Sequence, residues 1–270
     1  MSKIRADVLL VQQGLAETRA QARRLIQAGQ VKANDQVVVK PGTLLRPDAR
    51  LEVISGPRFV SRGGEKLAAA LEAFPLQVRN AVAADVGAST GGFTDCLLQH
   101  GARRVYAVDV GRGQLHWKLR QDPRVIVMEG VNARYLERLP EPVDIITTDV
   151  SFISLTKLWP VLKGWLAPSG GEGIALVKPQ FEVGRQAAAK TKGVIRDPAL
   201  WRAALETVLE AAYAQGYAAQ GLLPSPVLGP KGNVEFLLHW RYPGSARLAD
   251  AALVQALEAA RAVRETRKRA

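Results

Sequence analysis

Four ionisable side chains occupy positions from which they could act together on one substrate. Asp149 and Lys178 each end a short apolar run with the length of a buried strand, so we expect both at the carboxyl edge of a parallel sheet. Glu235 interrupts the apolar run Val234–Leu238, where an unpaired buried carboxylate is costly, and Lys66 follows a glycine pair near a predicted helix start. Each residue alone fits a surface charge or a structural ion pair. The shared edge instead favours a pocket in which two lysines and two carboxylates neutralise one another.

A glycine-rich turn comes before three of these residues and offers a place for a ligand. Residues 81–86 form a run of strand length that is apolar except for Asp85, and residues 93–98 carry apolar side chains at helical spacing. Gly87, Gly91 and Gly92 lie between them, where a strand ends and a helix begins. Such a turn presents free backbone N–H groups and the positive end of the helix dipole, and glycine lets a ligand approach closely.

A carboxylate further along the chain points to a ligand that contains a ribose. Asp109 ends the next predicted strand, about 20 positions after Gly87, the spacing at which nucleotide-binding α/β folds place an acid on a ribose. The glycine pattern is not that of dinucleotide enzymes, and no triphosphate-binding Gly-Lys-Ser/Thr follows. The turn therefore fits a ribose-containing ligand without phosphates, most commonly S-adenosylmethionine, although a tight turn and a solvated aspartate are the alternative. The predicted cofactor contacts are Asp85, Gly87, Ser89, Thr90, Gly91, Gly92, Phe93, Asp109, Asn132 and Asp149.

Composition limits the classes of protein that remain. The chain has 270 residues, 47% of them hydrophobic and 23% charged, and no apolar run approaches the length of a membrane span. Because the N-terminus has no signal-peptide core, we expect a cytoplasmic protein. The net charge of +12 predicts a polyanionic partner, most simply nucleic acid, although an inert basic surface would give the same balance. The one cysteine, Cys96, excludes an intramolecular disulfide and is expected in the core, and the scattered histidines predict no metal.

The first 55 residues read as a small separate module. Two short helices, the second starting after Thr18 with a capping box, precede predicted strands over 30–33, 36–39 and 51–54. The order resembles the S-four-type RNA-binding module, which implies binding to structured RNA. A cationic helix face beside a basic hairpin suits a phosphate backbone, although a solvated face is the ordinary alternative. The predicted RNA contacts are Arg5, Arg19, Arg23, Arg24, Lys32 and Arg62.

The rest of the chain alternates strands with helices. Predicted strands cover 81–86, 104–109, 124–128, 143–149, 173–179, 216–224 and 233–241. Predicted helices begin near Gly64 and cover 93–98, 155–166 and 198–214. This alternation predicts an α/β fold with a doubly wound, Rossmann-like sheet, whose last two strands form an antiparallel pair at the edge. The predicted divisions are the N-terminal α+β RNA-binding domain over 1–55, a linker over 56–62, the sheet domain over 63–244 and a basic helix over 245–270.

Five motifs in order give the chain a family resemblance. They are Ser-Arg-Gly-Gly-Glu-Lys-Leu, Asp-Val-Gly-Ala-Ser-Thr-Gly-Gly-Phe-Thr, Thr-Asp-Val-Ser-Phe-Ile-Ser, Leu-Val-Lys-Pro-Gln-Phe-Glu and Lys-Gly-Asn-Val-Glu-Phe. The chain resembles the TlyA family over nearly its whole length. That resemblance implies an S-four-type module joined to an FtsJ-like methyltransferase domain, which transfers methyl groups from S-adenosylmethionine to cytidine ribose 2′-hydroxyls in 16S or 23S ribosomal RNA. It also implies a catalytic set of Lys66, Asp149, Lys178 and Glu235.

The implied chemistry explains the need for charged groups. A ribose hydroxyl is a weak nucleophile, so a base must take its proton as it attacks the methyl group, and Lys178 is our candidate base. An ordinary lysine is protonated at neutral pH. Burial and a neighbouring lysine favour the neutral amine, whereas neighbouring carboxylates favour the ammonium form. Two alternatives stay open: a hemolysin-like membrane-active protein, since family members often carry that name, and an RNA-binding protein without enzyme activity.

Overall fold

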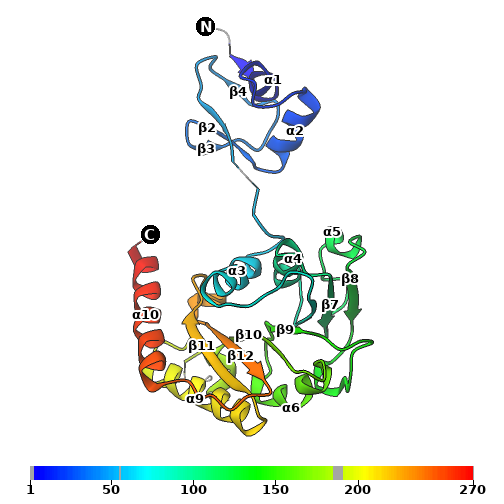
Figure 1. The fold of residues 1–270 in the computed structure, drawn as a ribbon. Coiled ribbons are helices and arrows are strands. Elements are labelled where there is room, and N and C mark those ends of the chain that lie inside the picture. The colour runs from blue at the N-terminus through cyan, green and yellow to red at the C-terminus, as the bar shows by residue number, and fades with distance from the viewer. Residues whose placement is uncertain (1–2, 55, 185–190, 270) are drawn as a thin grey trace. The chain divides into compact units, whose positions relative to one another are not determined.

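The computed structural model describes residues 3–54, 56–184 and 191–269, with side chains in the last helix described as far as residue 265. Within these residues the chain divides into two compact units, Met1–Arg58 and Phe59–Ala270 (Figure 1). Each unit has its own hydrophobic core and is described by itself.

The N-terminal unit is a small α+β domain. Its elements are β1 (Ile4–Arg5), α1 (Ala6–Gln12), α2 (Arg19–Gln27), β2 (Val31–Ala33), β3 (Gln36–Val37), β4 (Leu44–Leu45) and β5 (Leu51–Val53). Strand β2 is central in an antiparallel sheet of order β3-β2-β5, and β1 pairs with β4. Helix α2 begins as predicted, because the Thr18 hydroxyl accepts from the Gln21 N–H at 3.2 Å. The Gln21 amide oxygen accepts in return from the Glu17 N–H, one residue earlier than in a standard capping box.

The C-terminal unit is built on a seven-stranded sheet. Its strands are β6 (Val82–Val86), β7 (Arg104–Asp109), β8 (Val125–Glu129), β9 (Ile145–Thr148), β10 (Gly171–Val177), β11 (Ala218–Pro224) and β12 (Phe236–Tyr242). The order is β11-β12-β10-β9-β6-β7-β8. The five strands from β10 to β8 are parallel, and β12 runs antiparallel to both of its neighbours, β10 and β11. The predicted doubly wound sheet is confirmed.

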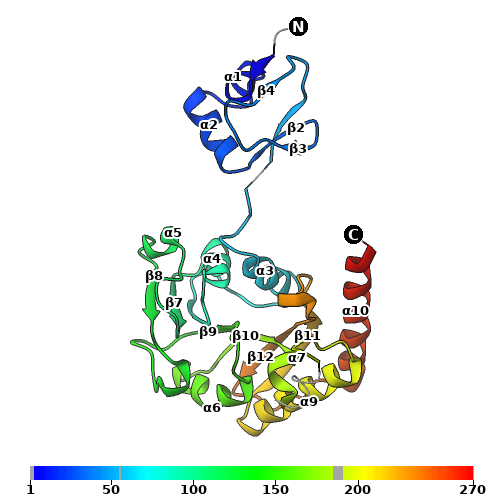
Figure 2. The same cartoon turned by 180° about the vertical axis from the view of Figure 1, so that it is seen from behind.

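Helices cover both faces of this sheet (Figures 1 and 2). They are α3 (Gly63–Ala73), α4 (Gly92–Gln99), α5 (Trp117–Arg120), α6 (Trp159–Leu162), α7 (Pro179–Glu182), α9 (Pro198–Ala214) and α10 (Asp250–Arg269). Side chains of α3, α4 and α5 pack into one core cluster, and those of α6, α9 and α10 pack into the other. Successive residues of β6 join opposite clusters, Ala83 on one face and Ala84 on the other, which explains why its sequence is apolar except for Asp85.

The helix predicted over 155–166 is wrong. Instead, two short 3₁₀ segments, Leu155–Lys157 and Lys163–Trp165, flank the single turn of α6. Pro160 has no N–H for a helical hydrogen bond, which prevents a continuous helix through this position. At the far end the Trp165 carbonyl accepts from the Val143 N–H instead of continuing a helix.

Candidate active site

The four candidate catalytic residues meet at one edge of the sheet. Asp149 follows β9, Lys178 follows β10, and Glu235 comes directly before β12. Because β12 is antiparallel to β10, its first residues lie at the edge where the parallel strands end. Lys66, on α3, reaches the same cavity, which has a volume of about 330 Å³ and is lined by all four side chains.

The first pair in this cavity is Lys66 and Glu235. The Lys66 Nζ donates to Oε2 of Glu235 at 2.5 Å, and both side chains are buried. The other carboxylate oxygen, Oε1, is buried and has no hydrogen-bond partner among the described residues. Gly229 makes room for it, since a Cβ at position 229 would lie 2.0 Å from Oε1. Glu235 lines the cavity, and an unpartnered buried oxygen is the kind of group that a ligand donor can satisfy.

The second pair is Lys178 and Asp149. Their Nζ and Oδ1 atoms are 2.7 Å apart, and Lys178 also donates to the Ser151 hydroxyl at 2.9 Å. Ser151 was not among the predicted site residues, although it lies only two positions after Asp149 in the same motif. The Phe181 ring centroid lies 6.0 Å from Nζ. These contacts hold the Lys178 amine at the wall of the cavity.

A second cavity adjoins the first and contains the predicted ribose-binding acid. It has a volume of about 350 Å³ and is lined by Asp109 and Asn132. Gly87, Ser89 and Asp149 line both cavities. Gly87 has a φ of +84°, and a Cβ there would lie 2.6 Å from the Asp149 carbonyl oxygen. Only glycine allows this close approach between the turn and the segment after β9 that carries Asp149.

The remaining residues of the turn divide into two groups. Thr90, Gly92 and Phe93 line the first cavity. Gly91 and Asp85 line neither cavity. A Cβ on Gly91 would collide with the side chains of Leu115 and Leu119, so this glycine serves the packing of the turn.

Asp85 lies beneath the turn and is fully buried. It accepts hydrogen bonds from the hydroxyls of Thr94 at 2.7 Å and Thr147 at 3.3 Å, which join β6 to α4 and β9. Burial raises the pKa of Asp85 to about 7, and the charge of Asp149 adds to the rise while the two hydroxyls oppose it. We therefore leave Asp85 and Gly91 out of the proposed cofactor contacts.

Two acids fix the loops around the second cavity. Asp109 accepts from the N–H groups of Ser89 at 2.8 Å and Gly111 at 2.7 Å, so it fastens the glycine turn to the end of β7. Glu129, which the sequence prediction missed, accepts from three successive N–H groups in the loop that carries Gln114, a residue of the cavity wall. The Arg120 guanidinium and these N–H groups lower the pKa of Glu129 to about 2.

A third cavity opens beside Lys178. It has a volume of about 650 Å³ and shares Ser151 and Lys178 with the first cavity. Its wall includes Phe152, which is 92% exposed, has a φ of +65°, and contacts the Phe181 ring at a centroid distance of 5.2 Å. An exposed aromatic ring next to a cavity is suited to stacking on a nucleobase.

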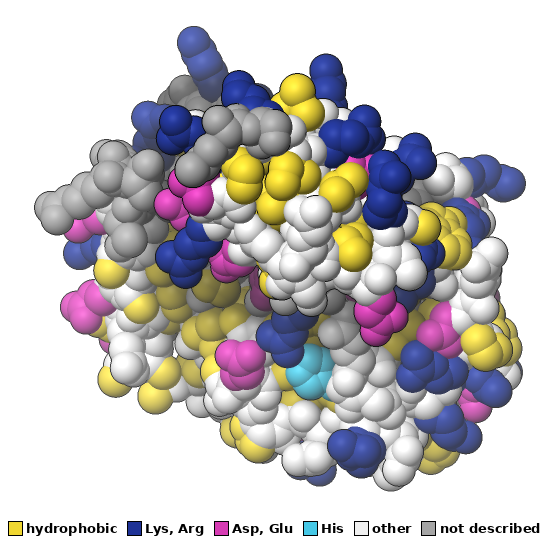
Figure 3. All heavy atoms as spheres, turned by 90° about the horizontal axis from the view of Figure 1, so that it is seen from above, with side chains coloured by type: hydrophobic (Ala, Val, Ile, Leu, Met, Phe, Trp, Pro, Cys, Tyr) yellow, Lys and Arg dark blue, Asp and Glu magenta, His cyan; other side chains and the backbone are white. Residues whose placement is uncertain are grey.

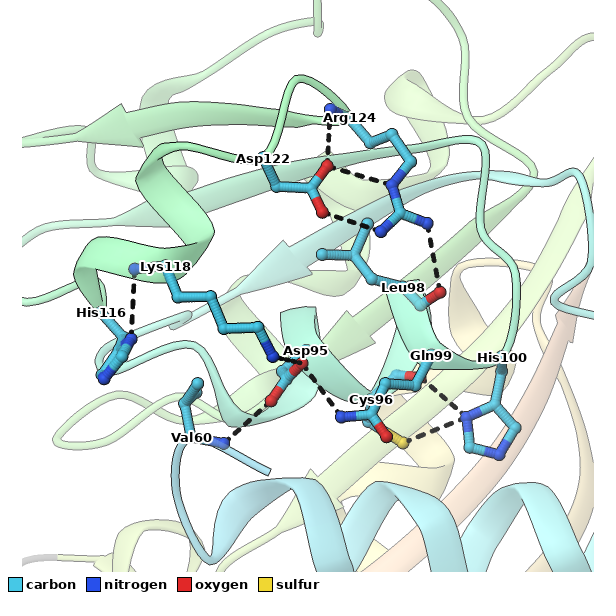
Figure 4. Close-up of polar contacts among 10 residues, drawn as sticks. All are labelled: Val60, Asp95, Cys96, Leu98, Gln99, His100, His116, Lys118, Asp122 and Arg124. Atoms are coloured by element: carbon cyan, nitrogen blue, oxygen red, sulfur yellow. Dashed lines mark hydrogen bonds and ion pairs between the residues drawn. The ribbon is translucent and has the colours of Figure 1, made fainter. Parts of the chain in front are cut away.

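The segment that enters the C-terminal unit is fastened to α4 (Figure 4). Asp95, which is buried, accepts from the Val60 N–H at 2.9 Å and from the Gln99 amide at 3.1 Å, and Lys118 lies 3.9 Å away. Cys96 is buried on the same helix, as expected of a core thiol. These contacts position the start of α3, where Arg62 lines the first cavity.

The predicted RNA contacts of the N-terminal unit also differ among themselves. Arg5 and Arg19 both bond to the buried carboxylate of Asp7, at 2.9 Å and 3.1 Å. Arg23 and Arg24 are exposed, and within the described residues neither has an ion-pair partner. Lys32 lies partly exposed on β2. Figure 3 shows exposed lysine and arginine side chains, in dark blue, on the face that it presents.

The described residues contain neither a candidate membrane-spanning helix nor a candidate metal-binding cluster. No helix in this part of the chain combines the length and the apolar character that crossing a membrane requires. Among the same residues, no three His, Cys, Asp or Glu side chains are grouped so that they could hold a metal ion.

Comparison with known proteins matches both units. The sequence profile of FtsJ-like methyltransferases matches residues 59–242, and that of the S4 domain matches residues 4–51. YqxC of Bacillus subtilis, which carries a provisional rRNA methyltransferase name, is 50% identical over 91% of this chain and 88% of its own. The 16S/23S rRNA (cytidine-2′-O)-methyltransferase TlyA of Mycobacterium tuberculosis is 44% identical over 88% of this chain and 90% of its own. A solved Streptococcus thermophilus structure, provisionally named a hemolysin, has 42% identity and a TM-score of 0.76 over all of both chains.

Proposed function

The chain belongs to the TlyA family of FtsJ-like methyltransferases with an S4 domain, and from this premise we propose that it methylates the 2′-hydroxyl of cytidine in 16S or 23S ribosomal RNA, or in both. One observation carries the proposal. Two lysine–carboxylate pairs, Lys66–Glu235 and Lys178–Asp149, line one cavity that adjoins a second cavity at the glycine turn. A cytoplasmic location is part of this proposal, because the proposed substrate is ribosomal RNA.

Fold and family imply a methyl donor of the S-adenosylmethionine type, and we propose S-adenosylmethionine itself. None of the described residues that line the second cavity is Lys or Arg, which fits a ligand without phosphates. Asp109 would hold the ribose hydroxyls, and the Asn132 amide would contact the base. Gly87, Ser89 and Asp149 would face both the donor and the first cavity. When bound, the donor supplies an electrophilic methyl group on a sulfonium.

We propose that Lys178 takes the proton from the ribose hydroxyl. The amine is held by Asp149 and Ser151, which fixes its direction toward the first cavity. Lys66 and Glu235 line the same cavity, and the unpartnered Oε1 of Glu235 would accept from a bound hydroxyl or amine. Positioning of the hydroxyl by these groups supplies much of the rate, since the reacting atoms must be in line. The third cavity gives room for the target nucleotide beside Lys178.

The N-terminal unit, in this proposal, holds the RNA. Arg23, Arg24 and Lys32 would bind phosphates, whereas Arg5 and Arg19 serve first to satisfy the buried Asp7. We propose residues 1–55 as the RNA-binding domain, 56–62 as a linker, 63–244 as the catalytic domain and 245–270 as a basic C-terminal segment, which contains α10.

A methyl-transfer assay tests the function. The protein is incubated with methyl-labelled S-adenosylmethionine and ribosomal RNA, either free or in assembled subunits. We expect label in RNA at a cytidine whose 3′ phosphodiester bond has become resistant to alkali, because a 2′-O-methyl group removes the nucleophile for that cleavage. Label on the base, or no label with any of these substrates, would overturn the proposal. Lysis of erythrocytes by the same preparation, without methyl transfer, would instead support the hemolysin alternative.

A further inference from the structure

An arginine cluster lies on the C-terminal unit, away from the three cavities described above. Arg196 precedes α9, and Arg261 and Arg264 lie on α10. Together with Pro198, Trp201 and Glu265 they line a cavity of about 200 Å³. None of these residues lines the three cavities around the glycine turn and Lys178.

Packing brings the three arginines together. Helix α10 lies beside α9 and β11 in both ribbon views and buries Leu253, Leu257 and Ala260 in the core (Figures 1 and 2). The Arg264 Nη1 donates to the Arg196 carbonyl oxygen at 3.0 Å. These contacts turn the polar face of α10 toward the start of α9.

Trp201, which lines the cavity, is held by packing and by a hydrogen bond. Trp201 is 1% exposed, and its indole N–H donates to the Ile195 carbonyl at 3.0 Å. Asp197, the nearest carboxylate in sequence to Arg196, accepts from the Ala199 N–H at 2.9 Å as the N-cap of α9. That carboxylate is therefore already engaged by the helix.

Two nearby arginines, unlike the three that line the cavity, are paired with carboxylates. Arg202 pairs with Asp250, and Arg247 forms two hydrogen bonds with Glu210. In the described part of the chain, by contrast, no carboxylate lies within ion-pair distance of the three cluster arginines. Three guanidinium groups and one carboxylate, that of Glu265, line the cavity, which gives it a net positive charge.

We propose that this arginine cluster binds the phosphate backbone of the RNA substrate. Guanidinium groups that lack a carboxylate partner present donors that match a phosphate in geometry and charge. An anionic membrane fits less well, because a helix that lies in a membrane interface needs an exposed apolar face. The leucines of α10 that would form such a face are buried against the unit. The inference rests on the proposed function, since it assigns the catalytic unit its own contact with that RNA.

The test compares two double variants that remove the same charge. Arg196→Ala/Arg261→Ala removes two cluster arginines, and Arg202→Ala/Arg247→Ala removes two paired ones. RNA affinity is measured from about 50 to 200 mM salt. Loss of two phosphate contacts should reduce the slope of log affinity against log salt by about 1–2 in the cluster variant only. Its KM for RNA should rise, while its kcat at saturating RNA and its affinity for S-adenosylmethionine stay unchanged.

Three outcomes would be decisive against the cluster. Equal salt slopes for both double variants would overturn the inference. Unchanged RNA binding by Arg261→Glu would overturn it too. This variant reverses one charge at an exposed position, so its result does not depend on whether the double variant folds. Loss of binding to phosphatidylserine vesicles with an unchanged RNA slope would assign the cluster to membranes instead. If the unaltered protein transfers no methyl group to RNA, the proposed function fails, and the salt slopes still report on this contact.

Discussion

Two clusters of opposite charges, one in each unit, both contain a buried carboxylate and differ in their surroundings. In the N-terminal unit the buried Asp7 accepts from Arg5 and Arg19, whose side chains are 47% and 60% exposed. In the C-terminal unit Lys66 and Glu235 are both buried and line a cavity. The first cluster leaves no oxygen of its carboxylate without a donor, whereas Oε1 of Glu235 has none.

This difference separates a structural ion pair from a functional one. Asp7 ties the first strand and both helices of its unit together, and water reaches the arginines that neutralise it. The catalytic-cavity pairs keep unused hydrogen-bonding capacity beside empty volume, which folding alone does not require. Removal of a cavity residue should therefore change the reaction, and removal of Asp7 should change stability.

The largest expected effect is at Lys178. Lys178→Ala should lower single-turnover methyl transfer on saturating RNA by about 10²–10⁴-fold while RNA and cofactor still bind, because a base acts only in the transition state. Lys178→Arg should fail nearly as badly, since arginine keeps its proton in proteins. Lys163→Ala is the matched control, because Lys163 donates to Gln215 and lines none of the site cavities. If Lys178→Arg retains most of the rate, Lys178 is an electrostatic anchor and not the base.

Asp109 should affect binding more than the chemical step. Asp109→Ala should weaken S-adenosylmethionine binding by about 1–3 kcal/mol, because the ribose hydroxyls and the N–H groups of Ser89 and Gly111 lose their acceptor. Titration calorimetry measures the change. Asp122→Ala serves as the control, since Asp122 pairs with Arg124 and lines neither the first nor the second cavity. Equal affinities of these two variants would remove Asp109 from the cofactor site.

Asp7 should affect stability without affecting chemistry. The hydrogen bond from Arg5, followed by that from Arg19, holds the pKa of Asp7 below its ordinary value. The stabilisation is therefore present at neutral pH and is lost as pH falls through the folded-state pKa. Asp7→Asn should lower the local unfolding free energy at pH 7 by about 1–3 kcal/mol, measured by hydrogen exchange of α1 and α2 amides. Glu17→Gln, at an exposed position, should leave the hydrogen-exchange protection of these amides unchanged. Unchanged protection in Asp7→Asn would contradict a structural role.

Asp85 provides a third case, a buried carboxylate that forms no ion pair with any of the described residues. Its pKa is about 7 in the folded protein against 3.8 as the ordinary value, so between these values the folded state holds the extra proton. The unfolding free energy contributed by this group should therefore fall as pH rises from about 4 to about 7. Asp85→Asn should flatten that dependence in urea unfolding at pH 5 and pH 8. A slope equal to that of the unaltered protein would show that Asp85 is ionised in the fold throughout this range.

The smallest effect is expected on the basic face of α2. Arg23→Ala/Arg24→Ala should reduce the salt slope of RNA binding by about 1–2 and leave stability and cofactor affinity unchanged. Arg19→Ala should instead lower the hydrogen-exchange protection of α1, because it removes a donor from Asp7. If Arg19→Ala changes only the salt slope of RNA binding, Arg19 does not differ in role from Arg23 and Arg24.

The sequence was sufficient to predict the sheet and the meeting of the four candidate catalytic residues. Each apolar run of strand length is a strand, because residues on both faces of a parallel sheet must be apolar, and three site residues stand next to strand ends. Local pattern could not reveal which charged groups pair. Asp7 with Arg19 and Glu129 with the 113–115 amides depend on loop paths that no periodicity encodes. The helix predicted over 155–166 is wrong because Pro160 interrupts a segment whose apolar spacing is otherwise helical.

The contact between Lys66 and Glu235 has a consequence for the timing of activity. The two residues are 169 positions apart in the chain, and β12, which begins directly after Glu235, follows the other described strands of the sheet in sequence. Contacts across so long a separation form late in folding, since the intervening chain must first be ordered. A nascent chain can assemble the glycine turn and the ends of β9 and β10 before residue 235 leaves the ribosome. Any activity that depends on this contact is therefore acquired only after residue 235 has been synthesised, later than the glycine turn and the ends of β9 and β10.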